Sequence, residues 1–448
     1  MAEWSDPEPT STLAHFPPGY SVAISALMLF GAEPAQAARA LDALSAGATV
    51  CAIVLVVGGT VGFIPATVAG VAILVSRPIV LVHLSVLSEP LFLALLALTL
   101  LALTRRAPPV VSGILAAVAA LVRYAGVSVG AAVVLWELLS PGELKRRIAR
   151  AAIAVAPTVV LQGAWTIYVS ATSGPKSIRE LGIYHGFGAT LAEGGRTIAA
   201  WLAPTSDEPG IARLWIGALL VVAAGTLVAL GVRRAIREKH PALRALAACG
   251  CLLACYAGVV VVSRLVADAG IPFDERILSP AVLLCTTVAI IAIAVLWPHA
   301  GLIVRWLSMA GFSAWAGLSA AASTTDAIFA TTEGSDFANT QWRDSETIAW
   351  TREHATDLPV YSNWPAALYF HDHRASWMLP ETDDPKTLKA FVDTLTARHA
   401  FVVAFDAESP DGPTPEQIAQ RVGLRVMIRL KDGTIYRPPY APGEIISP

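Results

Sequence analysis

The chain has 448 residues, of which 55% are hydrophobic and only 15% are charged, and its formal net charge is -2. Globular proteins average about one quarter charged residues, so this composition excludes an ordinary soluble protein and predicts that many apolar side chains face lipid. The sequence also has no cluster of basic residues of the kind that forms the basic face of nucleic-acid-binding proteins, so we expect no nucleic-acid partner.

The first 19 residues are polar, acidic and proline-containing, and they lack the basic start and cleavage pattern of a signal peptide. We expect them to form an exposed loop. An apolar run at about 20–31 follows and is too short to cross a bilayer. It is expected to lie at the membrane interface or to re-enter the membrane.

Ten longer apolar segments come next, and each is nearly free of charge. A helix of about 20 residues crosses roughly 30 Å of hydrocarbon and satisfies its own backbone hydrogen bonds there. The sequence Arg123–Gly126 predicts a turn near a membrane face between two segments that are short for spans. The ten predicted spans are 38–57, 62–82, 86–104, 109–122, 126–139, 151–171, 211–231, 244–264, 277–297 and 300–321.

Basic residues are concentrated in three connections on one side of these spans, and short cytoplasmic loops of membrane proteins are enriched in Lys and Arg. We therefore expect that side to face the cytoplasm. The segments expected on the extracytoplasmic side are 1–19, 172–210, 265–276 and everything after about 322. The basic residues concerned are Arg105, Arg106, Lys145, Arg146, Arg147, Arg150, Arg233, Arg234, Arg237, Lys239 and Arg244.

After about residue 322 short alternating patterns replace the long apolar segments, which predicts a soluble extracytoplasmic domain at 323–448 behind a multi-span domain at 1–322. Alternating helices and strands are typical of an α/β layer, and Asp432-Gly433 is typical of a two-residue hairpin turn. The expected fold is a polytopic α-helical membrane protein with a C-terminal α/β domain. Its predicted elements are helices near 341–355, 364–371, 386–398 and 414–421, strands near 358–361, 375–379 and 400–405, and a hairpin around 431–433.

Glu89 stands at the start of a predicted span, in the sequence Leu87–Pro90. One interpretation is a helix start, in which Ser88 caps the helix, Glu89 favours its positive end and Pro90 fits the first turn. An added role in a polar cavity stays open, because a polar residue beside a span is energetically costly. We therefore also place Glu89 with the predicted substrate-binding residues.

Three arginines map to the predicted extracytoplasmic ends of spans, and two basic residues lie in the neighbouring loop. Each arginine alone could simply extend its charged end towards water. Together they would suit a phosphate or pyrophosphate group, which arginine binds through paired donors. The residues of this predicted substrate site are Arg123, Arg264, Arg276, Lys176 and Arg179.

Asp6 and Glu8 are the carboxylates of the first exposed loop, and either could remove the proton of an acceptor hydroxyl as general base. Acidic residues on a tail commonly have no such role. We expect no metal site. The apolar surroundings of Cys249, Cys251 and Cys255 favour close helix packing over metal binding, and His371-Asp372-His373 favours a surface turn. No nucleotide-binding motif occurs, and no cofactor is evident.

Several segments, taken in order, resemble bacterial members of the C-type membrane glycosyltransferases, and more narrowly the group related to protein O-mannosyltransferases and aminoarabinose transferases. His15–Tyr20 precedes a short apolar helix, and we place His15 with the substrate-binding residues. Phe273–Pro280 is similar to the R-Y-L-x-P segment of this group. The other similar segments are Ala38–Leu44, Leu87–Phe92, Leu121–Gly126 and Tyr361–Pro365.

The resemblance implies a multi-pass enzyme of the bacterial plasma membrane that serves the cell envelope. Such an enzyme takes a sugar, mannose in some relatives, from a polyprenyl-phosphate donor and passes it to a lipid, polysaccharide or protein acceptor on the extracytoplasmic side. Members begin with a span and a loop whose early aspartate acts as base. This chain resembles only the later half of that loop, so we expect it to lack the first span and that aspartate. The sequence leaves the divalent-metal dependence open.

Two other functions stay open. Many spans with intramembrane charges also serve secondary transporters and lipid flippases, although no inverted repeat is evident and the predicted outer domain is large. A non-catalytic role in envelope assembly is the third possibility, because the aspartate that acts as base in the family is not recognised in this chain.

Overall fold

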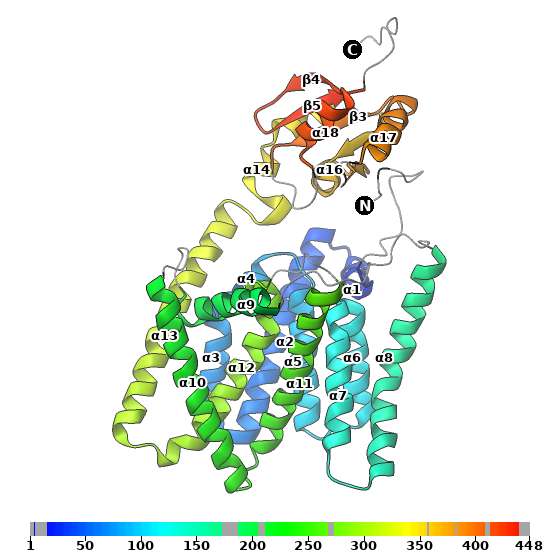
Figure 1. Ribbon diagram of the computed structural model, residues 1–448. Helices are drawn as coiled ribbons and strands as arrows, with labels where there is room; N and C mark the ends of the chain where they lie inside the picture. The colour runs from blue at the N-terminus through cyan, green and yellow to red at the C-terminus, as the bar shows by residue number, and fades with distance from the viewer. Residues whose placement is uncertain are drawn as a thin grey trace, which may run out of the picture. The chain divides into compact units, whose positions relative to one another are not determined.

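Apolar helices form most of the chain between residues 16 and 328 in the computed structural model (Figure 1). The structure describes residues 4, 16–172, 187–204, 211–267, 273–355, 358–380, 382, 384–407 and 413–438. They belong to two compact units. The helical unit covers Ala14–Ile328, and the other unit combines Met1–Leu13 with Phe329–Pro448.

Each of the ten predicted spans falls on at least one helix of the structure. The apolar run at 20–31 is also helical, as α1 (Gly19–Met28). The further helices are α2 (Pro34–Val61), α3 (Phe63–Val75), α4 (Arg77–Leu84), α5 (Glu89–Thr104), α6 (Pro109–Val122), α7 (Val127–Leu139), α8 (Leu144–Thr172), α9 (Phe187–Leu202), α10 (Ile211–Arg237), α11 (Leu243–Val262), α12 (Glu275–Leu296) and α13 (Leu302–Thr332).

Five helices in the described part of the chain are long and apolar enough to cross a membrane. They are α2, α8, α10, α11 and α12. A sixth span results if α3 and α4 are counted together, although they are bent by 53°. The total of ten spans therefore stays a prediction.

The segment 62–82 was predicted as one span, and the structure divides it into the two helices α3 and α4. Ser76 adopts an extended conformation between α3 and α4, and Pro78 stands in the first turn of α4. Proline has no backbone N–H and clashes with the preceding turn, so the sequence favours a new helix here.

Helix α5 lies in the core of the helical unit, with Phe92, Leu93, Leu96 and Leu100 each at most 1% exposed. It packs on α2, α6 and α11. Because nearly all of its faces contact protein, its 16 residues need not match the full thickness of a bilayer. This central position lets residues at its first turn meet side chains from several helices.

A mixed five-stranded sheet forms the centre of the C-terminal unit, with the strand order β2-β1-β3-β5-β4. Strand β1 pairs in parallel with β2 and β3, and the remaining pairs are antiparallel. The strands are β1 (Val360–Ser362), β2 (Trp377–Met378), β3 (Phe401–Phe405), β4 (Arg425–Arg429) and β5 (Gly433–Arg437).

Helices cover both faces of this sheet, as the alternation along β3 requires. Val402 and Ala404 join one hydrophobic cluster, whereas Val403 and Phe405 join the other. The first cluster contains residues of α17 (Pro385–Ala397) and α18 (Pro415–Val422), and the second contains residues of α14 (Thr340–Arg343), α15 (Glu346–His354) and α16 (Pro365–Asp372).

Two local expectations in this unit are corrected. The helix expected at 341–355 is interrupted, because Ser345 caps a new helix by accepting a hydrogen bond from the Ile348 N–H at 3.1 Å. The hairpin turn consists of Lys431 and Asp432, while Gly433 already begins β5. A Cβ atom at Gly433 would lie closer than 3.0 Å to the Ala404 carbonyl oxygen, so this glycine serves close strand packing.

Candidate functional site

The centre of the candidate site is Glu89, whose side chain is only 3% exposed. Ser88 was expected to cap α5, but its side chain makes no capping hydrogen bond. Its hydroxyl instead lies 3.4 Å from the Glu89 carboxylate and accepts a hydrogen bond from Arg123 Nη1 at 3.1 Å. The first turn of α5 is therefore part of a polar cluster inside the bundle.

Two arginines from other parts of the helical unit bind this carboxylate. Arg123 Nη1 lies 2.5 Å from Glu89 Oε2, and Arg276 Nε lies 2.5 Å from Oε1. A buried carboxylate is tolerated only when its charge is compensated and its oxygens accept hydrogen bonds. Glu89 and the two arginines carry a formal sum of +1, because two positive groups face one negative group.

Local structure explains how each arginine reaches Glu89. Arg123 is the residue after α6 and has an extended backbone (φ -148°, ψ 142°), which turns the chain from α6 into the short helix Tyr124–Gly126. Arg276 stands in the first turn of α12, which is capped by Asp274 through a 2.8 Å hydrogen bond from the Ile277 N–H. The structure thus brings together three residues of the predicted substrate site.

Arg264 is the third predicted arginine, and it pairs with a different carboxylate. It lies on a π-helical turn, Ser263–Ala267, and forms an ion pair with Glu193 of α9. Its guanidinium carbon also lies 4.9 Å from the centre of the Phe273 ring. No sequence motif indicated Glu193, which lies on a helix with a polar and an apolar face.

Two further charged side chains of the helical unit, Asp42 and Arg77, were not predicted as functional residues. Asp42 of α2 is 4% exposed and accepts a 3.4 Å hydrogen bond from the Tyr20 hydroxyl of α1. Arg77 of α4 binds Asp326 of α13 through Nε at 2.6 Å and Nη2 at 3.2 Å, and lies 3.9 Å from Glu275. A charged residue inside or beside a predicted span was the available signal for Asp42 and Arg77.

The remaining predicted site residues lie outside the described residues. These are Asp6, Glu8, His15, Lys176 and Arg179. Among the residues that are described, no group of three or more His, Cys, Asp and Glu side chains could hold a metal ion. The five cysteines are free.

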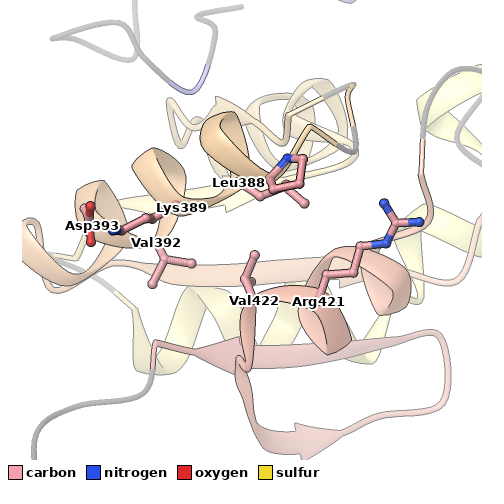
Figure 2. Close-up of a pocket in the computed structure, with 7 residues that line it drawn as sticks. Leu388, Lys389, Val392, Asp393, Arg421 and Val422 are labelled. Carbon is pink, nitrogen blue, oxygen red and sulfur yellow. The ribbon is translucent and has the colours of Figure 1, made fainter.

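A groove of about 580 Å³ lies between α17 and α18 of the C-terminal unit (Figure 2). Val392 and Val422 point into the space between the two helices, and Lys389, Asp393 and Arg421 add charged groups to its lining. None of the predicted site residues that the structure describes lines this groove.

Comparison of the structure with solved structures identifies related folds. The chain superposes on the Archaeoglobus fulgidus oligosaccharyltransferase with a TM-score of 0.51 and 12% sequence identity, covering 90% of this chain and 61% of that chain. The fold of this chain is that of the C-type membrane glycosyltransferases. The chain thus spans less than two thirds of this oligosaccharyltransferase, which was solved in complex with Zn and sulfate.

Two other structures with the C-type fold are also similar to this chain. ArnT from Cupriavidus metallidurans, in the apo state, has a TM-score of 0.45 at 14% identity, with 96% of this chain and 88% of that chain covered. The arabinofuranosyltransferase AftD from Mycobacteria has a TM-score of 0.49 at 16% identity, with 97% and 40% covered. No protein-family model and no curated protein matches the sequence.

Proposed function

We propose that this protein is a membrane glycosyltransferase that takes a sugar from a polyprenyl-phosphate donor and passes it to an acceptor on the extracytoplasmic side. The observation that carries the proposal is the convergence of Arg123 and Arg276 on the buried carboxylate of Glu89. The fold shared with an oligosaccharyltransferase supports it. A similar structure of ArnT was solved with undecaprenyl phosphate bound, which suits this class of donor.

The charge of this cluster favours an anionic ligand. Glu89 neutralises one of the two positive charges and binds both guanidinium groups, so that the three side chains together keep a formal charge of +1. The Arg276 side chain is 49% exposed and binds Glu89 through Nε. We propose that its terminal nitrogens and Arg123 bind the donor phosphate, since guanidinium groups bind phosphate oxygens through paired donors.

The proposed reaction breaks the bond between the sugar anomeric carbon and the phosphate oxygen and forms one to the acceptor oxygen. The phosphate leaves with the bonding electron pair, and the acceptor hydroxyl loses its proton to a base. Positive groups placed where the negative charge develops lower the barrier. We propose Arg123 and Arg276 for that role.

Asp6 and Glu8 stay the predicted carboxylates for the acceptor proton, and His15, Lys176, Arg179 and Arg264 stay predicted substrate-binding residues. The proposal extends to a plasma-membrane location and an extracytoplasmic C-terminal domain. The proposed acceptor is a lipid, a polysaccharide or a protein.

Donor binding to arginine variants tests the proposal. We expect Arg276→Ala and Arg123→Ala each to weaken the binding of polyprenyl phosphate to purified protein in lipid nanodiscs by at least tenfold, because each removes a charge-assisted hydrogen bond of about 1.5–3 kcal/mol. Transfer from radiolabelled polyprenyl-phosphate sugars to membrane acceptors should fall in parallel.

Arg150→Ala is the matched control. Arg150 also pairs with a buried glutamate, Glu137, at 2.7 Å, but on α7 and α8 away from the cluster around Glu89. Arg150→Ala and Arg276→Ala therefore each remove an arginine that pairs with a buried carboxylate, while only Arg276→Ala removes a proposed phosphate ligand. Equal losses of binding in Arg150→Ala and Arg276→Ala would contradict the assignment, and so would wild-type binding in Arg276→Ala.

A further inference from the structure

The short segment that carries Arg276 is fixed by contacts on both sides. Asp274 caps α12, the Tyr256 hydroxyl donates a 2.5 Å hydrogen bond to the Ile277 carbonyl, and Ser279 Oγ donates to the Arg276 carbonyl at 2.8 Å. A guanidinium group at the end of a long side chain gains affinity when its backbone is held in the bound geometry. The position of Arg276 therefore depends on how firmly this segment is held.

Helix α9 holds the other end of the segment through both backbone groups of Phe273. The Phe273 N–H donates to Glu193 Oε1 at 2.8 Å, and the Phe273 carbonyl accepts from the Thr197 hydroxyl at 2.5 Å. Glu193 and Thr197 are one helical turn apart, so they share a face of α9. One face of this helix thus binds the residue that lies three positions before Arg276.

Helix α9 is itself anchored to the bundle, so it can serve as a fixed support. It lies across the ends of the bundle helices (Figure 1). Trp315 of α13 donates a 3.0 Å hydrogen bond to the Trp201 carbonyl, and Gly217 of α10 packs closely against Ala199. The Arg264 guanidinium contacts both the Glu193 carboxylate and the ring of Phe273, and so also links α9 to Phe273.

We propose that α9 positions Arg276 for the donor phosphate and that the Thr197 hydroxyl is a positioning group in this role. The proposal deepens the function proposed above and rests on it, because Arg276 is taken there as a phosphate ligand. Thr197 itself does not touch the ligand. It holds the Phe273 carbonyl, and the chain from Phe273 to Arg276 transmits the constraint.

Hydrogen exchange in the full-length protein tests the structural part without any substrate. In Thr197→Val we expect the amides of residues 273–278 to exchange about fivefold faster than in the wild type, since one hydrogen bond contributes about 1 kcal/mol. Thr197→Ser keeps the hydroxyl and should exchange like the wild type. Unchanged exchange in Thr197→Val would overturn the inference.

Thr226→Val is the control for the loss of a threonine hydroxyl. Thr226 of α10 bonds the carbonyl of Val222 four residues earlier in its own helix at 2.7 Å, as Thr197 also bonds Glu193 at 3.2 Å. It makes no other hydrogen bond among the described residues. We expect Thr226→Val to leave the exchange of residues 273–278 unchanged, and an equal acceleration would count against a specific role of Thr197.

Polyprenyl phosphate binding tests the link to Arg276. Thr197→Val should weaken binding about fivefold in the wild-type background and not at all in the Arg276→Ala background, because a positioning group acts through the residue that it positions. An equal loss in both backgrounds, or no loss in either, would overturn the inference. If the wild type binds no polyprenyl phosphate, the proposed function fails, while the exchange experiment still decides whether α9 holds this segment.

Discussion

At the scale of single residues, carboxylates in this protein organise contacts between segments that are far apart in the sequence. Glu89 was predicted to start a helix, and α5 does begin there. Its charge, however, is compensated by residues 34 and 187 positions later in the chain. Hydrophobic periodicity and capping preferences describe neighbours along the chain, so they cannot name such partners.

Asp432 illustrates the same point in the C-terminal unit. It was predicted as a turn residue, and it does lie in the turn between β4 and β5. Its carboxylate also accepts hydrogen bonds from the Ser345 hydroxyl and from the N–H and hydroxyl of Thr347, at 3.1 and 2.9 Å. The turn is thereby joined to the start of α15.

We expect Asp432→Ala to destabilise the C-terminal unit by about 1–3 kcal/mol, because buried donors lose their acceptor. Faster hydrogen exchange of the amides in β3 would measure this effect in the full-length protein. Asp344→Ala is the control, since the Asp344 side chain is 71% exposed and, among the described residues, pairs only with its neighbour Arg343. Similar exchange in the two variants would show that the Asp432 contacts add little stability.

At the scale of elements, apolar length and proline position predicted much of the helical unit. Helices α2, α11 and α12 extend over the predicted spans, and the Arg123–Gly126 turn lies between α6 and α7. The bend at Ser76 was missed even though Pro78 indicated it. Apolar length alone cannot separate one straight span from two helices that meet at an angle.

Close contact between α6 and α8 depends on Gly113. A Cβ atom at this position would lie closer than 3.0 Å to the Ala154 carbonyl oxygen of α8, a backbone atom that cannot turn away. We expect Gly113→Ala to destabilise the helical unit by about 1–3 kcal/mol through overpacking, and thermal unfolding in detergent would show a lower midpoint.

Gly163→Ala supplies the comparison on the facing helix. No atom of the described residues lies within 4 Å of a Cβ atom built at Gly163 of α8. Alanine favours a helix over glycine by about 1 kcal/mol, so we expect an unchanged or slightly higher midpoint. A fall as large as that of Gly113→Ala would mean that any added methyl group disturbs the protein in detergent.

At the scale of the whole molecule, the orientation in the membrane stays a prediction from the distribution of basic residues. We expect Glu143→Cys, between α7 and α8, to react with a membrane-impermeant maleimide only after permeabilisation of spheroplasts. Glu33→Cys, between α1 and α2, should react in intact ones. The five native cysteines would be replaced in both variants, and the reverse labelling pattern would invert the predicted topology.

The sequence by itself determined that this chain is helical and apolar, with an α/β region at its C-terminal end, because composition and periodicity are local properties. It also pointed to Glu89, Arg123 and Arg276, since charged groups beside apolar segments are costly without a partner. Only the tertiary structure decided that these three meet and that Arg264 binds Glu193 instead. The pairing of buried charges depends on which helix ends meet in space. Helix packing brings together residues that are far apart in the chain, and local sequence patterns do not predict such contacts.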